Sequence, residues 1–186
     1  MIKRIFLAGL LGCLTLMVWA FVANGFLGLT ARIAMNRVAD EPATYRVLKE
    51  NVTAPGGYMV NPPLTEEGVF PPGEPAFGVR YGGVGHEAAG RGALLHLALA
   101  FVTATLAAAL LSAASERVLR GFWRKVAFVA GIGLLMALAC DVPEHGIGGY
   151  PMASALALAA NRLLSWTAAG CAMAWLIGVP ARGARA

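Results

Sequence analysis

The residues that could do chemistry flank or interrupt long apolar runs. Asp141, Glu144 and His145 fall within the short segment CDVPEHGIGGYP, residues 140–151, which separates two such runs. Arg162 interrupts the second of these runs. Carboxylates, an imidazole and a guanidinium group can pair by charge, transfer protons or bind a metal ion. The elements that position these side chains therefore decide which chemistry is possible.

Arg162 is the most demanding of these residues. If its apolar run is a helix that crosses a bilayer, Arg162 lies roughly 15 Å along the axis, close to mid-depth. A charge there costs at least about 2.5 kcal/mol and needs a partner. Either the crossing begins near Arg162, which then extends to the surface, or Arg162 is buried and pairs with Asp141 or Glu144. The candidate site is an intramembrane or interfacial polar cluster of His96, Asp141, Glu144 and Arg162.

The three histidines raise the possibility of a metal or haem site. Zinc or copper could use His86 and His145 with nearby carboxylates, and haem could use His96 within an apolar run. No HxxxH or ExxH pair on one helix supports either site, and YGGVGHEAAG at 81–90 lacks the GxGxxG spacing of a nucleotide loop. We therefore predict no catalytic residue, no cofactor and no metal.

The three cysteines do not indicate a disulfide framework. Cys13, Cys140 and Cys171 are odd in number, widely separated and embedded in or beside apolar runs. Buried, unreactive thiols are the expected state.

Composition places the chain in the membrane. Hydrophobic residues make up 58% and charged residues 13% of the 186 residues, whereas soluble domains have about 45–50% and about 25%. The net charge of +5 comes from bases at the ends of apolar runs rather than in one patch, which argues against nucleic acid as a partner. Lipid is the expected first partner.

Four apolar runs predict four transmembrane helices, because about 20 apolar residues cross a bilayer. A secretory signal peptide is the alternative for the first run, but the run is longer than a typical signal core and lacks a convincing cleavage site. The third run is short unless Arg124 and Lys125 extend their stems along lipid. The predicted spans are about 5–29, 92–115, 119–141 and 152–179.

Loop charges predict the orientation. Four spans place both termini on one side, which with the 115–125 loop carries eight basic residues and one acid. The other side carries six basic residues and nine acids. Because the basic excess stays in the cytoplasm, both termini are expected there, with residues 30–91 and 142–151 periplasmic.

The segment 30–91 is the sizeable polar region. Asp40-Glu41-Pro42 predicts a helix start and a short helix to about residue 51. Residues 58–60 and 77–81 are expected to form two facing strands. Within the spans, small residues recur at helix-packing intervals and indicate contacts within one chain or between copies. These pairs are Ala8 with Gly12, Ala127 with Gly131, and Gly133 with Ala137.

Three stretches, at 40–62, 141–151 and 163–176, together resemble a group of small bacterial membrane proteins of unknown function. The matching motif is Gly-Tyr-x-x-x-Pro, here Gly57, Tyr58 and Pro62. The resemblance implies a bacterial inner-membrane location and brings no catalytic residues with it.

The expected fold is a single all-α integral membrane domain over 1–186, with four transmembrane helices and an extracytoplasmic segment between helices one and two. The expected function is non-enzymatic: an accessory or structural subunit that binds other membrane proteins or itself. One alternative is a metal- or haem-binding redox protein that uses His86, His96 and His145. A small transporter is disfavoured, because only His96 and Arg162 are ionisable within the spans.

Overall fold

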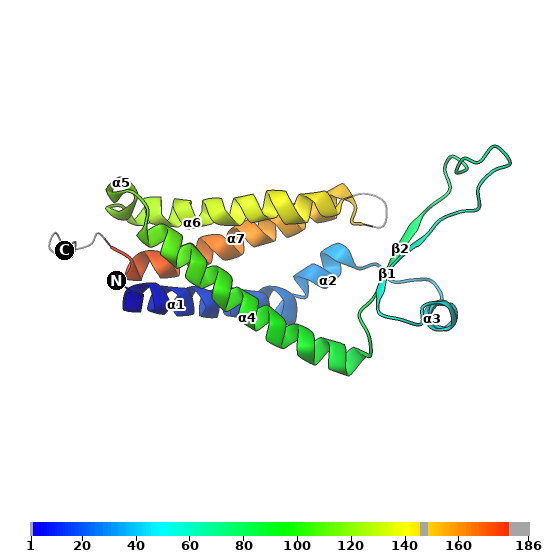
Figure 1. Ribbon diagram of the computed structural model, residues 1–186, viewed down its shortest axis with the longest axis horizontal. Helices are drawn as coiled ribbons and strands as arrows, with labels where there is room; N and C mark the ends of the chain where they lie inside the picture. The colour runs from blue at the N-terminus through cyan, green and yellow to red at the C-terminus, as the bar shows by residue number, and fades with distance from the viewer. Residues whose placement is uncertain (1, 146–148, 179–186) are drawn as a thin grey trace.

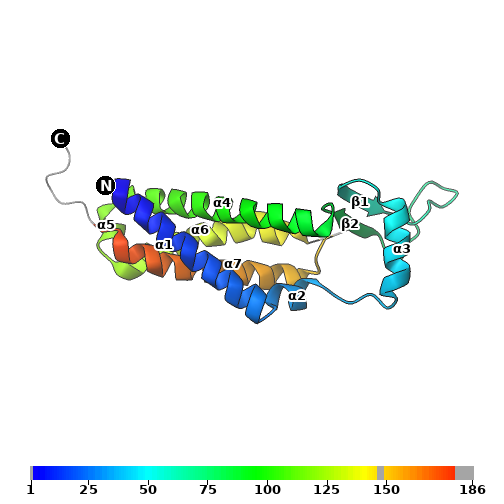
Figure 2. The same ribbon diagram turned by 90° about the horizontal axis from the view of Figure 1, so that it is seen from below.

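The computed structural model describes residues 2–145 and 149–178 and is largely helical (Figure 1). Side chains at 34 and 86–89 lie outside the described part, as do Gly146 and Gly148, at which the glycine-rich sequence favours a chain reversal. Four long helical segments form a bundle. A smaller outer module, residues 35–84, extends from one end of it (Figure 2). The bundle consists of α1 (Ile2–Ala20) with η1 (Phe21–Phe26), α4 (Gly85–Ser112), α6 (Phe122–Met136) with η2 (Ala137–Asp141) and η3 (Val142–Glu144), and α7 (Met152–Leu176).

Three of these segments are long and apolar enough to cross a membrane: Ile2–Phe26, Gly90–Ser112 and Phe122–Glu144. They correspond to the first three predicted spans. The fourth predicted span is also helical, as α7, but it carries Asn161 and Arg162 near its middle and does not belong to this set.

The helices pack in the order α4, α1, α7, α6. Helix α1 contacts both α4 and α7, and α7 contacts α6 along its length, whereas α4 meets α6 over a small area. The start of α1, the one-turn helix α5 (Glu116–Leu119) and the end of α7 share one end of the bundle (Figures 1 and 2). Toward the opposite end, α4 diverges from α6 and α7 (Figure 1).

Small residues let these helices approach closely. A Cβ added at Gly9 of α1 would lie 2.7 Å from the Thr105 Cα on α4, and one added at Gly133 of α6 would lie 2.4 Å from the Trp166 Cβ on α7. Two of the three predicted small-residue pairs are buried, whereas Ala127 is exposed and Gly131 faces open space. The close contacts therefore join helices within one chain.

The outer module begins after α2 (Leu29–Ala34). Helix α3 (Glu41–Asn51) confirms the predicted cap, because the Asp40 side chain accepts a hydrogen bond of 3.0 Å from the Ala43 amide. The strands β1 (Gly56–Val60) and β2 (Phe77–Tyr81) confirm the predicted pairing as an antiparallel hairpin, so the chain is not purely α-helical. In Figure 2, α3 lies across the direction of the bundle.

The starts of two helices differ from the sequence prediction in ways that the local sequence explains. Helix α4 begins at Gly85, seven residues before the predicted span that starts at about residue 92, and within the glycine-containing stretch 81–90. Alanines 88 and 89 favour a helix there and offset the cost of Gly85 and Gly90. Helix α6 begins at Phe122 instead of residue 119, because α5 ends at Leu119 and Gly121 adopts an extended conformation.

Candidate functional site

The polar centre of the bundle is an ion pair between α7 and the end of η2. Arg162 donates through Nε to Asp141 Oδ2 and through Nη2 to Asp141 Oδ1, the latter at 2.7 Å. The Asp141 side chain is 13% exposed and that of Arg162 is 35% exposed. This two-point geometry is the strong form of a guanidinium–carboxylate contact. Arg162 therefore has Asp141, and not Glu144, as its carboxylate partner.

Helix geometry explains why Arg162 reaches Asp141. Side chains on a helix lean toward its N-terminus, and α7 begins at the end of the bundle where η2 finishes. The long arginine side chain thus extends toward that end from a position deeper in the bundle. The guanidinium charge of Arg162 is therefore paired with the carboxylate of Asp141.

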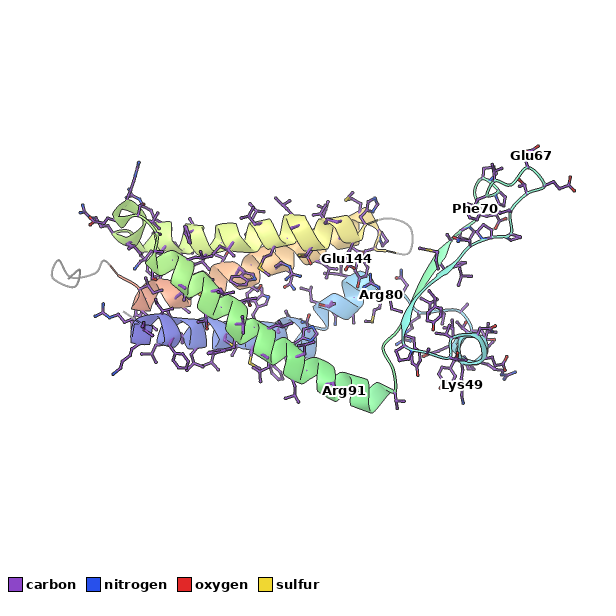
Figure 3. All side chains as sticks on the ribbon, viewed as in Figure 1. Lys49, Glu67, Phe70, Arg80, Arg91 and Glu144 are labelled. Atoms are coloured by element: carbon purple, nitrogen blue, oxygen red, sulfur yellow. The ribbon has the colours of Figure 1, made fainter. Side chains whose placement is uncertain are left out.

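Glu144 serves a different arginine. Its Oε2 lies 3.2 Å from Arg80 Nη2 of strand β2, and both side chains are well exposed (Figure 3). Asp141 ends a π-helical segment and Glu144 ends a 3-10 turn, so the two carboxylates do not share one helical face. The four residues from Asp141 to Glu144 therefore bind one arginine from the bundle and one from the outer module.

His96 is not brought to the ion pair by any described contact. It lies in the outer half of α4, is exposed, and has its Nδ1 2.7 Å from the Gly92 carbonyl oxygen of its own helix. His145 has Nδ1 3.2 Å from the Tyr150 carbonyl oxygen. The side chain of His86 lies outside the described part. Among the residues that the structure describes, no group of three His, Cys, Asp or Glu could hold a metal ion.

A second polar contact beside the ion pair was missed at the sequence level. Trp19 Nε1 donates to Asn161 Oδ1 at 2.9 Å and joins α1 to α7. Two adjacent residues of α7, Asn161 and Arg162, are thus bound to two different segments. A polar residue inside an apolar run was visible in the sequence for Asn161, but nothing identified Trp19 as its partner.

The partners of Asn161 and Arg162 both adjoin π-helical turns. Trp19 lies two residues before η1, and Asp141 is the last residue of η2. A π-helical turn inserts an extra residue into the α pattern, which changes the direction in which neighbouring side chains point, and such turns are frequent at functional sites. No sequence signal identified either turn. In this chain they accompany the two side chains that bind Asn161 and Arg162.

Lys125 corrects a prediction about the other end of the bundle. It was expected to extend along lipid with its charge in water, but it is 9% exposed. Its Nζ donates to the carbonyl oxygens of Ala174 at 2.5 Å and Ile177 at 2.6 Å. These oxygens lie at the C-terminal end of α7, where the helix has carbonyls without intrahelical partners and favours a cation. Lys125 therefore fastens α6 to the end of α7.

The cysteines are only partly as expected. Cys13 is buried and Cys171 half-buried, in keeping with the prediction, but Cys140 is exposed on the bundle surface. All three are free thiols.

The arrangement positions helices and matches charges. Arg162 and Asp141 satisfy each other, and the contacts of Asn161 and Lys125 likewise join neighbouring segments. Comparison with known protein families, curated proteins and solved structures finds no match for this sequence or fold. The resemblance to small bacterial membrane proteins therefore stays a prediction.

Proposed function

We propose that this protein is an accessory or structural subunit of the bacterial inner membrane that binds other membrane proteins. The observation that carries the proposal is the outer half of α4. Residues 93–99 are all exposed, over nearly two full turns, so the described chain leaves every face of the helix there at least partly uncovered. This stretch includes Leu94, which is 70% exposed, and the polar His96. A helix of another membrane protein packed on this stretch would cover both.

The proposal includes α7 as a fourth span. Support comes from its neighbours: α7 packs along α1 and α6, two segments apolar enough to cross a membrane. Its two strongly polar residues, Asn161 and Arg162, both have partners inside the bundle. Helices in lipid must satisfy polar groups internally, and α7 does so.

The proposed orientation places both termini in the cytoplasm and residues 30–91 and 142–151 in the periplasm. The start of α1 and the end of α7 lie at one end of the bundle, beside α5 with its exposed Arg117 and Arg120 (Figure 2). The outer module lies at the opposite end. The basic end supports a cytoplasmic assignment.

Reporter fusions test this orientation. A fluorescent protein that matures only in the cytoplasm should be bright when fused after Ala186, and alkaline phosphatase, active only outside, should be inactive there. The same two reporters inserted within the loop at Gly73 should give the reverse pattern. Active phosphatase both after Ala186 and at Gly73 would remove α7 from the set of spans.

Native complexes test the function. Tagged protein extracted from its own membranes in mild detergent should migrate with one or more other membrane proteins. Replacing Ala98 of α4 with tryptophan should abolish that association, because the added ring projects from the uncovered stretch. Tryptophan at Ala127, exposed on α6, is the matched control and should leave the complex intact. A wild-type protein that migrates alone would end the proposal.

A further inference from the structure

The loop between the two strands of the outer module carries apolar and acidic side chains. Residues 61–76 contain three glutamates and neither lysine nor arginine. Leu64, Val69 and Phe70 are each more than half exposed. In Figure 3, Glu67 and Phe70 lie at the far end of the hairpin, away from the bundle. The segment 64–70 is called the acidic tip below.

Hydrogen bonds fix the shape of the acidic tip. Gly68 donates its amide to the Thr65 carbonyl at 2.9 Å, and Thr65 donates its amide to the Val69 carbonyl at 2.9 Å. Gly68 has φ of 75°, which favours glycine at this turn. Glu66 and Glu67 thus occupy the corner of a closed turn, and Leu64 and Phe70 flank its base.

Prolines restrict the chain on both sides of the tip. Pro62 and Pro63 precede it, and Pro71 and Pro72 follow it, with the Glu74 amide 3.4 Å from the Pro71 carbonyl oxygen in a second turn. A segment held in shape before binding loses less conformational entropy when it binds. The tip is therefore suited to recognition by a partner.

The base of the hairpin is attached to the bundle. Arg80 pairs with Glu144, and from Arg80 to the start of β2 at Phe77 the strand covers about 10 Å. The tip lies beyond that, on the side away from the bundle (Figure 3). A lipid surface at the end of the bundle is thus the less suitable occupant, and two adjacent carboxylates oppose contact with anionic lipids.

We propose that the acidic tip is a docking element for a separate protein whose surface has an apolar pocket bordered by lysine or arginine. Leu64 and Phe70 enter the pocket, while Glu66 and Glu67 face the basic border. Aromatic anchors in pockets provide most of the binding energy at protein interfaces, and rim charges govern association rate and salt dependence. The assignment rests on the proposed function, because it gives that subunit the chemical class of one partner.

Site-specific photo-cross-linking in native membranes tests the proposal. The full-length protein carries a photoreactive phenylalanine analogue in place of Phe70, or in place of Tyr45 of α3, an exposed aromatic outside the tip, as the control. We expect one protein adduct from position 70 and none from position 45. Mass spectrometry of the adduct should map the partner's contact beside lysine or arginine.

Charge dependence distinguishes docking from chance capture. The double variant Glu66→Gln and Glu67→Gln should lower the adduct yield about tenfold. Raising the salt concentration should also lower the adduct yield of the protein that keeps both glutamates. Thermal unfolding of this variant should match that of the wild type, because both side chains are exposed.

Four results would overturn the assignment: an adduct with lipid, an adduct with a second copy of the chain, an adduct insensitive to charge and salt, or no adduct from position 70. If any of these occurs while the wild-type protein still migrates with other membrane proteins, the tip assignment alone fails. A wild-type protein that migrates alone removes the subunit function as well.

Discussion

Replacing Asp141 with leucine lowers the free energy of unfolding by about 3 kcal/mol, the lower end of the usual loss for a buried ion pair, because the Arg162 side chain is 35% exposed. The variant leaves the Arg162 guanidinium without its carboxylate, in the same half-buried position. A guanidinium group cannot shed its proton to become neutral. The measurement is reversible unfolding in mixed micelles, followed by circular dichroism.

The opposite replacement should cost less. Arg162→Leu leaves Asp141 unpaired, but a carboxyl group can take up a proton and avoid a buried charge. Asp141→Leu combined with Arg162→Leu should return to within about 1 kcal/mol of the wild type, because apolar pairs often replace buried ion pairs without loss. Arg80→Gln, which breaks the exposed pair with Glu144, is the control and should cost less than about 1 kcal/mol. Equal losses of unfolding free energy for Asp141→Leu and Arg80→Gln would show that the Asp141–Arg162 pair contributes no more to stability than an exposed pair.

A single methyl group at Gly133 should separate α6 from α7. The new Cβ of Gly133→Ala would lie 2.4 Å from the Trp166 Cβ and 2.8 Å from its Cγ, so the helices must shift. Overpacking of this kind costs typically about 1–3 kcal/mol, and occasionally more. Because the contact involves the base of the tryptophan and not a flexible end, we expect the upper part of that range, measured by the same unfolding experiment.

Gly131, two residues earlier on the same helix, provides a matched control. A Cβ there meets nothing within 4 Å, so Gly131→Ala adds the same atoms without a collision. Alanine also favours the helix over glycine by roughly 1 kcal/mol. The control should therefore be neutral or slightly stabilising. If both alanine variants unfold alike, the close α6–α7 approach is not as described.

Local signals predicted the outer module well. The Asp40 cap, the length of α3 and the pairing of the two strands all follow from short stretches of sequence, because caps, prolines and alternating apolar residues act over a few positions. The beginning of α4 differs from the prediction, because the alanines of the stretch 81–90 favour a helix and outweigh its glycines.

The polar site was only partly predictable. The cost of a charge in lipid identified Arg162 and the need for a carboxylate, but Asp141 and Glu144 were equal candidates. The choice depends on the π-helical and 3-10 turns that end α6; Pro143 marks the end of the helix, but the sequence does not show in which direction each carboxylate points after it. Trp19 was missed because its contact spans 142 positions of sequence.

Lys125 had a signal that could have been used. It stands four residues before Val129 and eight before Gly133, so all three lie on one helical face, and the latter two are buried. Its position next to Arg124 suggested instead a pair of surface cations.

The contacts of α7 with Asp141 and Lys125 bear on how such a protein enters the membrane. In the proposed four-span arrangement, α7 is the segment that least readily enters the bilayer by itself, because its arginine enters lipid only when a carboxylate pairs with it. Asp141, which pairs with this arginine, and Lys125, which binds the C-terminal end of α7, both belong to the preceding segment. That segment is synthesised just before α7. On the four-span proposal, the last two spans partition into the bilayer together, as one helical hairpin, and insertion of the final span depends on the span before it.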